Sequence, residues 1–147
     1  MRALVLAILA ALAVTGHSAT VKAVHAEERE GFKVIVHPDN PARELERGFL
    51  RSAFLKKSTE WHGETVRPID LATRFTVRDR FTTDVIGKTR AQLRSYWNQQ
   101  IFSGKGVPPP EGESAAAVIA YVLAHRGAVG YLPASVDPGK ARVVPVR

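Results

Sequence analysis

The chain has 147 residues, of which 45% are hydrophobic and 24% are charged, with a formal net charge of +7 and no cysteine. This length accommodates one domain with a buried core, and the composition excludes a wholly disordered or collagen-like protein. The lack of cysteine excludes disulfides, thiol catalysis, cysteine-ligated zinc and an N-terminal lipoprotein anchor.

The first segment has the layout of a secretory signal peptide. Met1 and Arg2 give a positive start, and the residues from Ala3 to Val14 are all apolar. This run is shorter than the roughly 20 residues that a membrane-spanning helix needs. We therefore expect an exported protein, periplasmic or secreted, that does not span the membrane after cleavage.

The predicted domain organisation is a signal peptide over residues 1–26 and a single domain over residues 27–147. Cleavage after Ala19 or Ala23 is the alternative. Two basic residues would leave with the signal, so that the net charge falls from +7 to +5. No run of five or six basic residues occurs, and a solvated basic surface explains this charge more simply than nucleic-acid binding does.

The first predicted elements after the signal are a strand and a helix. Residues Phe32–Val36 are rich in β-branched side chains, which predicts a strand. Asn40 and Pro41 are typical of a helix start, and the apolar spacing predicts a helix from there to Lys57. Gly48 marks a point where this helix could divide into two.

The middle of the chain predicts an edge strand and a second helix. Val66–Leu71 has strand composition, and Pro68 within it favours an edge position. Thr76 and Asp79 have capping-box spacing, which predicts a helix over Val77–Ile86 that ends at the following glycine.

Two further helices and two strands complete the pattern. A capping box at Thr89 predicts a helix reaching Ile101, and Ser114 is the predicted cap of the next helix. Strands are expected over Ala128–Leu132 and Arg142–Val146. The order β-α-β-α-α-α-β-β predicts a single α/β domain.

The side chains that usually carry catalysis or metal binding form no recognisable motif. His37, His62 and His125 are far apart in the sequence, and neither a G-x-S-x-G elbow nor a phosphate-binding G-x-x-x-x-G-K-[ST] loop occurs. We therefore predict no catalytic residue, no metal and no cofactor, and expect no enzyme. Trp61 and the Tyr96-Trp97 pair are better explained by core packing than by nucleic-acid stacking.

Anion binding is the chemistry that the sequence favours. Arg74, Thr76 and Arg78 surround a predicted helix start, where free backbone N–H groups and arginine side chains favour a small anion. These three residues are the candidate ligand-binding residues. The alternative is that Thr76 only caps the helix and that Asp79 neutralises the arginines.

Several stretches resemble the phosphate ABC transporter substrate-binding proteins of the periplasm, including short single-lobe relatives. These stretches are Ile35 to Pro41, Phe54-Leu55-Lys56-Lys57 with Trp61 and Gly63, Arg67-Pro68-Ile69-Asp70, Tyr96 to Gly104 with Pro108-Pro109-Pro110, and Ala128 to Leu132. The resemblance implies an α/β fold: a single lobe of a type 2 periplasmic-binding-protein-like structure, with a central mixed sheet flanked by helices.

Two departures from that family leave two functions open. Full-length relatives have two lobes, and they carry Ser-Gly-Thr where this chain has Thr73-Arg74-Phe75-Thr76. The first hypothesis is a solute-binding-like protein for phosphate or another small anion, working with an ABC permease and covering its open site as a homodimer or with a partner. The second is an envelope interaction module of the same fold that binds no ligand. Neither hypothesis involves nucleic acid.

Overall fold

The computed structural model describes residues 30–147. The predicted signal peptide and the first residues of the predicted domain lie outside this range. Within the described range, no helix combines the length and apolar character needed to cross a bilayer.

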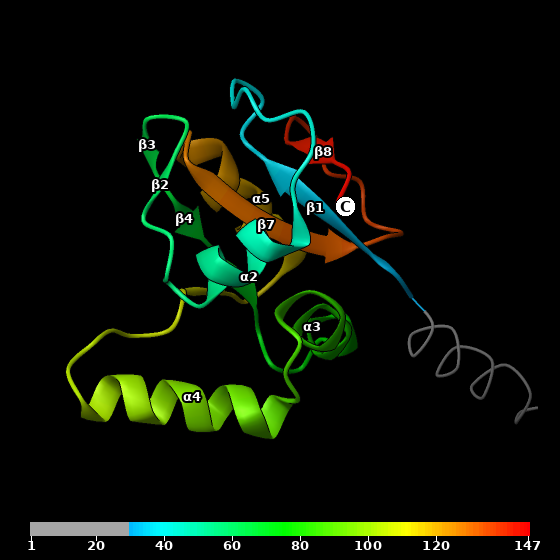
Figure 1. The fold of residues 1–147 in the computed structure, drawn as a ribbon. Coiled ribbons are helices and arrows are strands. Elements are labelled where there is room, and N and C mark those ends of the chain that lie inside the picture. The colour runs from blue at the N-terminus through cyan, green and yellow to red at the C-terminus, as the bar shows by residue number, and fades with distance from the viewer. Residues whose placement is uncertain (1–29) are drawn as a thin grey trace, which may run out of the picture.

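A four-stranded mixed sheet forms the centre of the domain (Figure 1). Its strands lie in the spatial order β4 (Arg67–Pro68), β7 (Ala128–Pro133), β1 (Phe32–Val36) and β8 (Arg142–Val144). β1 runs antiparallel to both β7 and β8, whereas β4 runs parallel to β7. The apolar run in β1 is buried on both faces, which explains why it does not alternate with polar residues. The strands predicted at both ends of the chain are confirmed.

The predicted strand Val66–Leu71 divides between two sheets. Its first half is β4, and its second half is β5 (Asp70–Leu71), which pairs in parallel with β6 (Glu111–Gly112). The chain leaves the central sheet at this point, because the Asp70 N–H donates to the carbonyl of Pro110 at 2.9 Å and not to β7. A separate hairpin is formed by β2 (Glu60–Trp61) and β3 (Glu64–Thr65).

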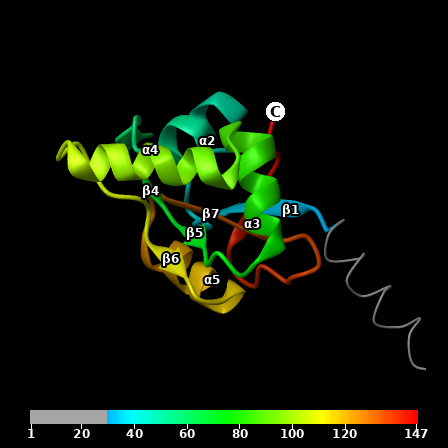
Figure 2. The same cartoon turned by 90° about the horizontal axis from the view of Figure 1, so that it is seen from below.

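Helices cover both faces of the sheet. α2 (Arg47–Phe54) and α5 (Ala115–Ala124) lie on opposite faces, as Figures 1 and 2 show together. α3 (Thr76–Phe81) continues directly into the π-helical turn η1 (Thr82–Ile86), and Gly87 ends it with a φ of 71°. α4 (Arg90–Phe102) lies farther out, on the α2 side of the sheet (Figure 2).

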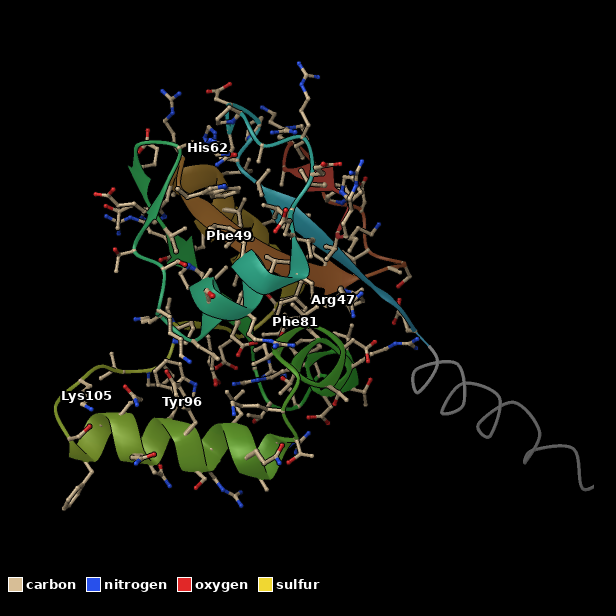
Figure 3. The ribbon with its side chains drawn as sticks, viewed as in Figure 1. Arg47, Phe49, His62, Phe81, Tyr96 and Lys105 are labelled. Carbon is tan, nitrogen blue, oxygen red and sulfur yellow. The ribbon has the colours of Figure 1, made fainter. Side chains whose placement is uncertain are left out.

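Only a few side chains connect α4 to the rest of the domain. Leu93 and Trp97 are buried, with exposed fractions of 7% and 8%. The Tyr96 hydroxyl donates to the carbonyl of Leu55 at 2.9 Å, and Figure 3 shows Tyr96 on the side of α4 that faces the sheet. The predicted core positions of Trp97 and Trp61 are therefore confirmed.

The core centres on stacked aromatic rings between the sheet and α3. Tyr131 of β7 and Phe81 of α3 are stacked, with centroids 3.9 Å apart. The ring of Phe54 in α2 packs against the Phe81 ring, with their centroids 4.8 Å apart. Figure 3 shows Phe81 at the inner side of these helices. α3 is thereby fixed against the sheet, which positions every side chain that it carries.

Two of the predicted helix starts are wrong and two are confirmed. The helix predicted from Pro41 begins only at Arg47, because the buried Asn40 side chain accepts the Ala42 N–H at 2.9 Å and forms a turn. The predicted capping box at Thr76 is absent, since Phe75 occupies the cap position without a side-chain bond. The capping box at Thr89 and the Ser114 cap both form as predicted.

Candidate functional site

Two clefts flank α3, and the three predicted anion contacts are divided between them. Arg74 and Thr76 line a cleft of about 230 Å³ at the start of α3, together with Glu30 and Ser135. Arg78 lines a cleft of about 390 Å³ between α3, η1 and α4. The structure therefore brings Arg74 and Thr76 together and places Arg78 separately.

The first cleft already holds a carboxylate of the chain itself. Ser135, in the loop after β7, donates its backbone N–H to Glu30 Oε1 at 2.9 Å, and its hydroxyl donates to the same oxygen. Arg74 binds the Glu113 carboxylate at 2.5 Å and also donates to the Glu113 carbonyl. The Arg74 guanidinium also lies 5.0 Å from the centre of the Phe75 ring. The Arg74–Glu113 ion pair and the Ser135–Glu30 hydrogen bonds are at the surface, so exchange with another anion is chemically feasible.

Arg78 is held by an ion-pair network at the inner wall of the second cleft. Its Nη2 lies 3.1 Å from Asp70 Oδ2, and its Nη1 donates to Glu111 Oε1 at 2.6 Å. Nη1 also donates to the carbonyl of Leu71 at 2.7 Å. The Arg78 guanidinium therefore joins α3 to both β5 and β6.

The carboxylate of Asp70 is the buried end of this network. Its side chain is 6% exposed, and it accepts hydrogen bonds from the Tyr131 hydroxyl and from the Leu71 N–H, the latter at 3.0 Å. Burial raises the pKa of Asp70, while Arg78 acts in the opposite direction without cancelling the rise. Burial and the neighbouring Asp70 charge raise the pKa of Tyr131 well above its ordinary value, which keeps this phenol a donor.

The two carboxylates beside Arg78 keep its guanidinium protonated. Burial alone would lower the pKa of Arg78, but the carboxylates of Asp70 and Glu111 raise it more, so that Arg78 stays fully charged. Sequence reasoning missed Asp70 and Tyr131 as members of a polar network. The available signal was an aspartate inside an apolar strand pattern, because such a residue needs a partner when the strand is buried.

The described part of the chain contains no group of three or more His, Asp or Glu side chains that could hold a metal ion. The arginines next to α3 are instead met by carboxylates. Arg90, on α4, makes a bidentate pair with Asp79, with Nε–Oδ1 and Nη2–Oδ2 distances of 2.8 and 2.5 Å. Asp79 thus neutralises an arginine, although not one of the three candidate contacts.

No family model and no curated protein matches this sequence. Solved structures do match it. A structure titled as an ABC-type phosphate transport receptor from Vibrio cholerae has a TM-score of 0.63 at 18% identity, over 80% of this chain and 46% of that one. A putative phosphate ABC transporter substrate-binding protein with bound phosphate, from Clostridium perfringens, has a TM-score of 0.62 at 19% identity, over 80% and 45%.

A possible phosphate-binding protein from Planctomyces limnophilus also matches, with a TM-score of 0.56 at 15% identity over 80% of this chain and 42% of that one. This chain has the fold of a single lobe of such proteins. It spans less than half the length of each of the three structures. The predicted fold, a central mixed sheet flanked by helices, is confirmed.

Proposed function

We propose that this chain is an exported, solute-binding-like protein that binds a small anion, with phosphate as the first candidate, and performs no chemistry. The observation that carries the proposal is the carboxylate already bound by the Ser135 N–H and hydroxyl in the cleft shared with Arg74 and Thr76. The fold supports the ligand class, because the matching structures are titled as phosphate-binding proteins or phosphate transport receptors.

In this proposal an external anion replaces the Glu30 carboxylate. Its oxygens accept the two hydrogen bonds from Ser135, and Arg74 turns from Glu113 to add a bidentate contact. The Arg74–Glu113 pair is exposed, with side-chain exposed fractions of 58% and 74%, so breaking it costs little. Thr76, the first residue of α3, is the third proposed contact. The role predicted for Arg78 stays a prediction, since Arg78 lines the other cleft.

Calorimetric titration with millimolar phosphate tests the proposal. Glu30→Gln removes the competing negative charge and is expected to tighten binding, whereas Ser135→Ala removes a donor and is expected to weaken it about fivefold. Ser95→Ala is the matched control, because Ser95 is exposed on α4 and lines neither cleft. Absence of binding heat in both the native protein and Glu30→Gln would refute the proposal, as would equal effects of Ser135→Ala and Ser95→Ala.

The proposal includes export and a partner. We expect a signal peptide over residues 1–26 and a mature domain over residues 27–147, which N-terminal sequencing of the exported protein tests. A single lobe leaves the cleft open to water, so a homodimer or an ABC permease is the proposed cover. Sedimentation with and without phosphate tests the first: a phosphate-dependent dimer supports it, and a monomer under both conditions excludes it.

The alternative function, an envelope interaction module, is favoured by one separate observation. Ile101, Phe102 and Val107 are apolar and exposed by 52%, 95% and 59% at the far end of α4. Such side chains fit a docking surface. Affinity capture from envelope extract with native and Phe102→Ser baits distinguishes the two functions. A partner lost specifically with Phe102→Ser, together with no phosphate binding, supports the alternative.

A further inference from the structure

The cleft between α3, η1 and α4 is separate from the proposed phosphate site. Its volume of about 390 Å³ lies within the range of roughly 300–1,000 Å³ that is typical of small-molecule sites. Its walls come from three segments: the helical run through α3 and η1, the inner face of α4, and the proline-rich loop before β6. The contents of this cleft indicate what kind of molecule it suits.

A threonine hydroxyl without a partner opens into this cleft. Thr82 is 3% exposed and lines the cleft, and its side chain makes no hydrogen bond with another described residue. Every fully enclosed side-chain nitrogen or oxygen in the described part has a partner, so the Thr82 hydroxyl must reach the cleft surface. The next residue differs, since the Thr83 hydroxyl donates to the carbonyl of Asp79 at 2.9 Å. An accessible hydroxyl with no partner among the described residues is a ready contact for a ligand.

The charges around the cleft leave a single cation uncompensated. Arg78 is paired with Asp70 and Glu111, and Arg90 is paired with Asp79. The third arginine of the lining, Arg94, makes no ion pair or hydrogen bond within the described part of the chain. One free guanidinium next to neutralised pairs suits a ligand with a single negative charge.

Apart from Thr73, the rest of the lining is mainly apolar. Leu93 and Trp97 of α4 line the cleft together with Pro108 of the loop, and both α4 residues are more than nine-tenths buried. Apart from the Trp97 indole N–H, these groups offer no hydrogen bond to a hydrophilic ion, but they can cover an apolar body. This part of the lining therefore favours a ligand with an apolar body over inorganic phosphate.

We propose that this cleft binds a small monocarboxylate with an aromatic or branched aliphatic body. The carboxylate contacts Arg94 and accepts a hydrogen bond from the Thr82 hydroxyl, while the body packs on Leu93 and Trp97. Each contact uses a group that the described part of the fold leaves open: a guanidinium without an ion pair, a hydroxyl without a partner and the apolar surface of the cleft.

Tryptophan fluorescence gives a direct readout. The chain has two tryptophans, so Trp61→Phe leaves Trp97 as the only one, inside the cleft. Phenylacetate is expected to change the Trp97 emission saturably, whereas acetate and inorganic phosphate at equal concentration are not. Saturation-transfer NMR on the native protein gives the same comparison without relying on the Trp61 substitution.

Two pairs of variants assign the contacts. Thr82→Val is expected to weaken phenylacetate binding about fivefold without lowering the melting temperature, whereas Thr83→Val leaves the affinity unchanged. Arg94→Gln is expected to weaken it about tenfold, with Arg43→Gln, an exposed arginine outside the cleft, as the control. Absence of saturable phenylacetate binding by both methods overturns the proposal. Equal binding of acetate, or equal effects of the two threonine variants, also overturns it.

Discussion

Replacing Arg78 by methionine tests the ion-pair network beneath the second cleft. Methionine keeps much of the length of the side chain but removes the guanidinium that binds Asp70 at 3.1 Å and Glu111 at 2.6 Å. The buried carboxylate of Asp70 would then have no cation beside it. Removing one partner of a buried pair costs about 3–5 kcal/mol. Asp70 retains the Tyr131 hydroxyl and the Leu71 N–H as donors, so we expect the lower end, about 3 kcal/mol, at neutral pH.

The loss should also depend on pH. Burial raises the pKa of Asp70 in the folded state above its ordinary value of 3.8, even with Arg78 present. A raised carboxyl pKa means that the folded state holds the proton more tightly, so this group reduces stability as pH rises from the unfolded pKa through the folded one. Without Arg78 the pKa of Asp70 in the folded state rises further, so the pH range over which this group reduces stability extends upward. The stability deficit of Arg78→Met should therefore grow as pH rises and shrink as pH falls towards the ordinary aspartate pKa of 3.8.

Urea unfolding of both proteins at several pH values measures this deficit. Asp70→Asn is the matched control, because Arg78→Met in the Asp70→Asn background removes no ion pair with residue 70. In that background Arg78→Met should cost only about 1 kcal/mol. The difference from the cost in the native protein is a coupling free energy of about 2 kcal/mol in the double-mutant cycle. A deficit below about 1 kcal/mol that does not change with pH would refute the reasoning.

Three further changes have expected outcomes that urea unfolding can check. Gly127→Ala should destabilise by at least about 2 kcal/mol, because the new Cβ would lie 2.1 Å from the carbonyl oxygen of Thr65, and little change would mean that β3 can move away. Gly48→Ala, where nothing lies within 4 Å, should instead stabilise α2 by about 0.5 kcal/mol; a loss there would contradict the helical assignment. Thr89→Ala removes the capping box with Gln92 and should cost about 1 kcal/mol, so an unchanged midpoint would mean that the cap contributes nothing.

Local signals in the sequence were sufficient where a short motif satisfies its own backbone. The capping box at Thr89 and the cap at Ser114 form as predicted, because their bonds reach only three residues along the chain. The same signal failed at Thr76. There the position of α3 is set by the packing of Phe81 on Tyr131, and the cap falls on Phe75.

The candidate site could be predicted only in part, for the same reason. Arg74 and Thr76 do meet at the start of α3, as their spacing suggested. Ser135 is distant in the sequence, and it comes to that cleft only because the loop after β7 passes α3. The hydrogen bonds that it donates to Glu30 join residues 105 positions apart, which no spacing rule anticipates.

The sequence alone determines the net charge of +7 and the lack of cysteine, which excludes disulfides and cysteine-based sites. Hydrophobic periodicity and caps decided which segments become helices and strands, because those preferences are local. Tertiary structure alone decided the partners of the arginines. It brought Arg78 to Asp70, left Arg94 without an ion pair among the described residues, and divided one predicted anion site between two clefts. Coulomb attraction and burial act through space, and the order of residues along the chain does not contain those distances.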